Sequence, residues 1–138
     1  GDIRASGLRE DGEGWMIAVR DPRPGGILPA QLRLTGGAVA TSGGYEARYD
    51  PDGSWHHIVS SRSGRSPTDA LSVTVTGPNV YASDALATAA LLMPPREGVR
   101  FIDSLPGFEC MVIDAGGRAA LSSGWTELTV TSHEDGVR

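Results

Sequence analysis

The chain of 138 residues contains no lysine, and all twelve of its basic residues are arginine. The absence of lysine excludes Schiff-base chemistry, a Walker-type phosphate loop and a Ser-x-x-Lys nucleophile. Cysteine occurs once, as Cys110 in an apolar run. No disulfide can therefore form within the chain, and this thiol is predicted to be buried in a strand.

Three further features are scarce: positive charge, long apolar runs and histidine. The net charge of -5 argues against a nucleic-acid partner, which selects basic surfaces. No apolar run approaches the roughly 18 residues that cross a bilayer, so no membrane-spanning segment is predicted. The adjacent His56-His57 pair and His133 have no zinc-type spacing with Cys110.

Short strand-like segments dominate the chain, which is long enough for one core. The 19 glycines favour a turn-rich globular protein. Residue composition and alternation predict extended segments at 15–19, 31–34, 37–42, 45–49, 56–59, 71–76, 109–113 and 119–122. Helices are predicted at 83–93 and 97–104. This pattern indicates an α+β fold with a mainly antiparallel sheet and one or two helices.

The helix predicted from Ser83 carries an acid and a hydroxyl four residues apart, Asp84 and Thr88. Ser83 is the predicted N-cap, and Pro94-Pro95 ends the helix. The spacing places Asp84 and Thr88 on one helix face, where their oxygens could hold a hard cation such as Mg²⁺. The alternative is that Asp84 favours the positive end of the helix dipole while Thr88 packs or bonds the backbone.

Six segments, in this order, carry a resemblance to a known family: Gly1–Gly7 (GDIRASG), Gly14–Val19, Ala38–Tyr45 (AVATSGGY), His57–Val59 leading to Gly64, Ser72–Pro78, and the SDALATAA helix. Together they resemble the ApbE family of FAD:protein FMN transferases. Residues 1–125 resemble the C-terminal portion of that family's domain, and residues 126–138 are expected to form a strand and a polar tail.

The resemblance implies a reaction and a set of site residues. It implies magnesium-dependent transfer of FMN from FAD to a serine or threonine of a target protein, with release of AMP. Asp84 and Thr88 would bind the metal beside the FAD pyrophosphate. The stretch His57-Ile58 would lie against the flavin nucleotide, where the imidazole could exchange a proton or hydrogen-bond. The alternative for His57 is a half-buried strand histidine.

The resemblance also implies that the small residues Thr41-Ser42-Gly43 line the nucleotide. No Gly-x-Ser-x-Gly elbow surrounds Ser42, so a nucleophilic role is disfavoured. Small side chains would instead let the nucleotide approach the main chain. The alternative is a backbone turn built from small residues.

Two features depart from the family's pattern. The family usually has Asp-Pro where this chain has Ser60-Ser61, and the loss of that carboxylate and proline is expected to loosen the loop. The segments that precede Gly1 in the family, including a Lys-Gly turn, cannot lie in a chain without lysine. We therefore expect a missing N-terminal half, or self-association, to cover exposed apolar surface.

Three functions remain open at this point. The first is the FMN transferase, with FAD and a flavin-acceptor protein as partners and Mg²⁺ as cofactor. The second keeps the same site but lets water attack, so that FAD is hydrolysed to FMN and AMP. The third is a noncatalytic flavin-binding or structural half-domain.

Overall fold

A five-stranded antiparallel sheet forms the centre of the computed structural model, which describes residues 1–26, 29–52 and 54–130. Its strand order is β1-β4-β5-β6-β7. The bounds are β1 Asp2–Ser6, β4 Gly36–Gly43, β5 Ala70–Gly77, β6 Glu109–Asp114 and β7 Ala119–Leu121. The predicted α+β class is confirmed.

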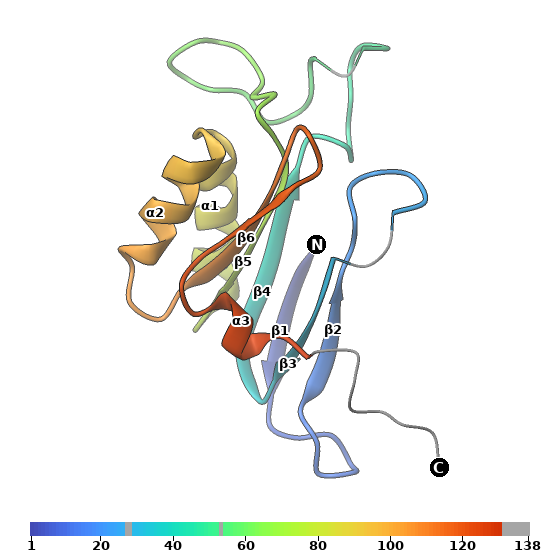
Figure 1. Cartoon of the computed structure of the whole chain (residues 1–138), viewed down its shortest axis with the longest axis vertical. Helices are drawn as coiled ribbons and strands as arrows, with labels where there is room; N and C mark the ends of the chain where they lie inside the picture. The colour runs from blue at the N-terminus through green and yellow to red at the C-terminus, as the bar shows by residue number, and fades with distance from the viewer. Residues whose placement is uncertain (27–28, 53, 131–138) are drawn as a thin grey trace.

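Two helices, α1 (Val80–Leu91) and α2 (Pro95–Asp103), cover one face of this sheet (Figure 1). The hairpin of β2 (Trp15–Val19) and β3 (Ala30–Leu34) lies on the other face, with the one-turn helix α3 (Trp125–Leu128). In the described residues no helix is long and apolar enough to cross a bilayer.

Each face of the sheet has its own core. The core on the helix side contains three valines of the sheet and two residues of α1: Val73, Val75, Val112, Ala87 and Leu91. On the other face, Val39, Met111 and Ile113 belong to a second core cluster with the β2–β3 hairpin and Trp125. Because side chains alternate along a strand, β5 and β6 are buried on both faces. Cys110 is fully buried in β6, as predicted.

The N-terminal boundary predicted for α1 was wrong by one turn. The helix is capped by Asn79, whose side-chain oxygen accepts a hydrogen bond from the Ala82 amide at 2.9 Å. Ser83 lies inside the helix, fully buried, and its hydroxyl donates to the Asn79 carbonyl. Both asparagine and serine favour N-caps, so composition alone did not separate the two positions.

Two predicted extended segments are not strands, and a third is described only in part. Residues 45–49 and 56–59 belong to the loop between β4 and β5, where Arg48 and His56 form an isolated β-bridge among the described residues. Of the strand and tail predicted over residues 126–138, the described part contains the end of α3 and Thr129, which forms an isolated β-bridge to Leu32. Residues 131–138 lie outside the described residues.

Candidate functional site

The end of β4 and the second half of α1 place two hydroxyl groups in contact. Ser42 pairs with Val73 in the sheet register, so it faces the helices. Its Oγ lies 2.9 Å from the Thr88 Oγ1, although the residues are 46 positions apart in the chain. Ser42 is buried and Thr88 is half-buried. The fold therefore brings together one predicted nucleotide-lining residue and one predicted metal ligand.

Asp84 lies one turn before Thr88 on the same helix and is exposed. Because α1 begins at Val80, Asp84 is in the second turn, where the helix dipole has little effect. No ion pair involves its carboxylate among the residues that the structure describes. The helix dipole therefore does not explain Asp84, and its carboxylate is exposed to solvent.

The Asp84 carboxylate and the Thr88 hydroxyl are oxygen donors of the kind that bind Mg²⁺. This ion prefers carboxylate, hydroxyl and water oxygens and usually keeps several waters or takes substrate phosphates. Within the described ranges, no group of three or more His, Cys, Asp or Glu side chains could hold a metal. A cation here would therefore depend on phosphate or water oxygens for its remaining ligands.

The side chains of His57 and Ile58 point in different directions, because successive side chains of an extended backbone alternate. Ile58 is buried in the core cluster on the helix side, so only its main chain could contact a nucleotide. His57 is exposed, and its backbone amide donates to the Ala47 carbonyl at 3.2 Å. The arrangement leaves the His57 imidazole accessible to a substrate.

Thr41 does not belong to the cluster formed by Ser42 and Thr88. It points to the opposite face of the sheet, where its Oγ1 lies 2.9 Å from the Thr74 Oγ1. Gly43 is also constrained by the protein itself, since a Cβ there would come within 2.9 Å of the Leu71 carbonyl oxygen and would meet the Tyr45 ring. Of the three small residues, Ser42 alone presents its side chain to the helix side.

The loop that carries Ser60-Ser61 is closed by hydrogen bonds within the loop. The Ser60 amide donates to the Arg65 carbonyl at 2.9 Å, and the Gly64 amide donates to the Ser60 carbonyl at 2.8 Å. The Ser60 hydroxyl accepts from the Arg62 amide at 3.3 Å, as a carboxylate at that position could. Gly64 has a φ of 68°, which glycine adopts without strain.

Sequence reasoning missed the part played by His56. It treated the histidine pair as a failed zinc motif and retained only His57. In the structure His56 is buried, and both of its ring nitrogens have hydrogen-bond partners. The period-two pattern of residues 56–59 was the available signal, because it places His56 on the same buried side as Ile58.

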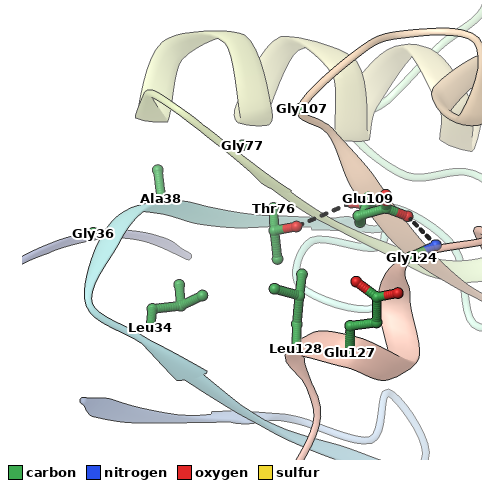
Figure 2. A pocket seen from close by; sticks show the side chains of 10 residues that line it. All are labelled: Leu34, Gly36, Ala38, Thr76, Gly77, Gly107, Glu109, Gly124, Glu127 and Leu128. Carbon is green, nitrogen blue, oxygen red and sulfur yellow. Dashed lines mark hydrogen bonds between the residues drawn. The ribbon is translucent and has the colours of Figure 1, made fainter. Parts of the chain in front are cut away.

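A cavity of about 290 Å³ lies at the opposite end of β4 from Ser42 (Figure 2). It contains the carboxylates of Glu109 and Glu127, and Glu109 accepts hydrogen bonds from the Ser122 hydroxyl and the Gly124 amide. Glu109 thus holds the start of α3, as Figure 2 shows for the Gly124 bond. Two carboxylates would repel the phosphates of a nucleotide, so this cavity does not suit one.

Comparisons with known proteins agree on one family. The model of the ApbE family matches residues 1–112. The FAD:protein FMN transferase of Treponema pallidum is 31% identical over 127 residues, which is 90% of this chain. The solved ApbE protein of Thermotoga maritima superimposes with a TM-score of 0.85 at 31% identity over 95% of the chain. The flavin transferase ApbE of Vibrio cholerae gives a TM-score of 0.72 at 28% identity over 93% of the chain.

The chain spans well under half the length of these proteins. It covers 34% of the Treponema protein, 43% of the Thermotoga chain and 42% of the Vibrio chain. The shared fold therefore concerns one portion of the larger proteins.

Proposed function

This chain belongs to the ApbE family, and from that premise we propose that it supplies part of a site that transfers FMN from FAD to a serine or threonine of a target protein, with AMP as the other product. The observation that carries the proposal is the group formed by Ser42, Thr88 and Asp84. Two hydroxyls contact each other there, and the exposed carboxylate of Asp84 lies one helical turn from Thr88.

The proposed reaction breaks the phosphoanhydride of FAD. The acceptor hydroxyl oxygen attacks the phosphorus of the FMN half, the bond to the bridging oxygen breaks, and AMP leaves with that oxygen. The exposed imidazole of His57 is proposed to take the proton of the acceptor hydroxyl. Asp84 and Thr88 are proposed to hold Mg²⁺, which when bound stabilises the negative charge that develops on the phosphate oxygens.

Ser42 is proposed to act beside the metal ligands rather than as a nucleophile. Its hydroxyl lies within hydrogen-bond distance of Thr88 and can fix the rotamer of that side chain. The Ser42 side chain is also small enough for a nucleotide to approach β4.

We further propose that the portion of the domain that this chain does not span docks along β1 and β2. Both strands are sheet edges, and they line a cavity of about 280 Å³. Ile3, Trp15 and Met16 are exposed there by 40–44%, although they are large and apolar. The relatives are more than twice as long as the matched region, so they contain enough chain to cover this surface.

The proposed function is tested by complementation. The 138-residue chain is mixed or co-expressed with the portion of the Thermotoga ApbE protein that it does not span, here called the complementary portion. FAD, Mg²⁺ and an acceptor protein are then added, and mass spectrometry follows FMN attached to the acceptor and free AMP. Attached FMN and AMP in equal amounts are expected. Free FMN with AMP would indicate the hydrolase instead, and no turnover of FAD would indicate a noncatalytic half.

The proposed docking surface can be tested with two matched substitutions in this chain. Met16→Glu places a charge on the proposed surface and should weaken association with the complementary portion. Leu121→Glu places the same charge on β7, at the far edge of the sheet, where Leu121 is equally exposed. Equal association of both variants, or self-association of the chain through β1 and β2, would contradict the assignment.

A further inference from the structure

The buried imidazole of His56 packs against the main chain just past the end of β4. His56 is 4% exposed, whereas its neighbour His57 is exposed. A Cβ built on Gly44 would lie 2.5 Å from the His56 Cδ2 and 2.7 Å from its Nε2. The ring therefore occupies the space that a side chain at residue 44 would need, and the contact ties the loop to β4.

Both ring nitrogens of His56 have defined partners. Nε2 lies 2.9 Å from the Pro67 carbonyl oxygen, which can only accept, so Nε2 carries the proton. Nδ1 lies 3.3 Å from the Ile58 amide, which can only donate, so Nδ1 is the acceptor. One neutral tautomer satisfies both bonds.

The main chain of His56 is fixed in the same place by Ser66. The His56 amide donates to the Ser66 hydroxyl at 3.0 Å, and that hydroxyl donates to the His56 carbonyl at 2.9 Å. The two ends of the loop 57–65 are thus joined at its base. Within the loop, the Ser60–Arg65 and Gly64–Ser60 backbone bonds complete a closed unit.

We propose that His56 is a positioning residue for flavin transfer. Its neutral imidazole packs against Gly44 and hydrogen-bonds to Ile58 and Pro67, and these contacts, here called the clasp, hold the exposed His57 in place relative to Ser42 and Thr88. This rests on the proposed function. His56 is buried away from solvent and uses both nitrogens within the protein, so it acts through His57 and not on the substrate.

Two substitutions of His56 separate the contributions of its two ring hydrogen bonds. In His56→Gln the side-chain amide can reach the Pro67 carbonyl from the position of Nε2 but leaves the Ile58 amide without its partner. In His56→Asn the side-chain oxygen can accept from the Ile58 amide near the position of Nδ1 but does not reach Pro67. Because the Pro67 bond joins the two ends of the loop, Gln should preserve the clasp better than Asn.

A double-mutant cycle tests the proposal in the complemented enzyme. His56→Ala should lower kcat about tenfold and change the FAD KM less than threefold, with His56→Gln restoring most of kcat. In a His57→Ala background, His56→Ala should change kcat less than twofold, because the group that it positions is gone. An equal loss in both backgrounds would overturn the proposal and indicate a general structural role.

A second measurement keeps the test independent of turnover. Hydrogen exchange of the Ser60 and Gly64 amides should accelerate at least tenfold in His56→Ala and return toward the unsubstituted rate in His56→Gln. Should the unsubstituted enzyme transfer no FMN, the proposed function fails while this exchange pattern still decides whether the clasp exists. Unchanged exchange in His56→Ala would overturn the clasp whatever the activity.

Discussion

Two adjacent residues of β4 make the same bond on opposite faces of the sheet. The Thr41 and Thr74 hydroxyls lie 2.9 Å apart on the hairpin side, and the Ser42 and Thr88 hydroxyls lie 2.9 Å apart on the helix side. The first bond joins neighbouring strands whose register already places the two threonines opposite each other. The second joins the sheet to a helix, one turn from the exposed carboxylate of Asp84. The comparison separates a bond that supports the sheet from one that forms part of a candidate site.

Among substitutions on the two faces of the sheet, Asp84→Asn is expected to have the largest effect on FMN transfer. Losing one of two proposed metal ligands should lower Mg²⁺-dependent FMN transfer by about 100-fold or more at limiting Mg²⁺. Folding should change little, because Asp84 is exposed and forms no ion pair with the described residues. Rates measured across a Mg²⁺ titration check this. The matched control is Glu127→Gln in the Figure 2 cavity, which should leave the rates unchanged.

The two hydroxyl pairs can be separated by Ser42→Ala and Thr41→Val. Each substitution leaves a partner hydroxyl without its bond and should destabilise the fold by about 1–3 kcal/mol. Only Ser42→Ala should also weaken FAD-dependent activity, by about tenfold, because it frees the Thr88 side chain. Denaturant unfolding and kcat/KM for FAD are measured for both variants. Equal losses of activity would remove the distinction between the faces.

Asp21, which follows β2 in the hairpin, is expected to make the stability of the fold depend on pH. Its carboxylate accepts hydrogen bonds from the Arg23 side chain at 3.0 and 2.7 Å, and these bonds lower the Asp21 pKa from 3.8 to about 2. A depressed folded-state pKa means that the stabilisation is present above pH 4 and is lost as the pH falls toward 2. Asp21→Asn should therefore lower the unfolding midpoint at pH 7, and the difference should shrink toward zero near pH 2. A difference that stays constant with pH would contradict this.

The smallest effect is expected from restoring Asp and Pro at Ser60 and Ser61. The double substitution adds a carboxylate and a fixed φ to a loop that is already closed. FAD affinity should therefore tighten only about two- to threefold. Titration of the complemented enzyme checks this, with Ser60→Asp alone as the control. Weaker FAD binding in the double variant would indicate that this loop does not border the bound FAD.

The sequence predicted the central strands and the presence of α1 and α2, because their signals are local. The β-branched run of β5, the alanine-rich α1 and the Pro94-Pro95 stop each determine structure within a few residues. The start of α1 was misplaced because Asn79 and Ser83 are both good caps, and only burial of Ser83 decides between them.

The candidate site was predictable as a list of residues but not as an arrangement. The spacing of Asp84 and Thr88 follows from the helix alone. The contact of Thr88 with Ser42 depends on how α1 lies across β4, which no local pattern specifies. The separation of Thr41 from Ser42 follows from strand alternation and could have been predicted. The role of His56 depends on Gly44 and Pro67, which are distant in sequence, so it required the structure.

The most direct test of the metal assignment is an amide NMR titration of the 138-residue chain with Mn²⁺, a paramagnetic substitute for Mg²⁺. The ion broadens signals close to where it binds, so it distinguishes the two ends of β4. We expect broadening at Asp84 and Thr88 that is lost in Asp84→Asn, with Glu109 and Glu127 unaffected. Broadening centred on Glu109 and Glu127, and unchanged in Asp84→Asn, would contradict the account.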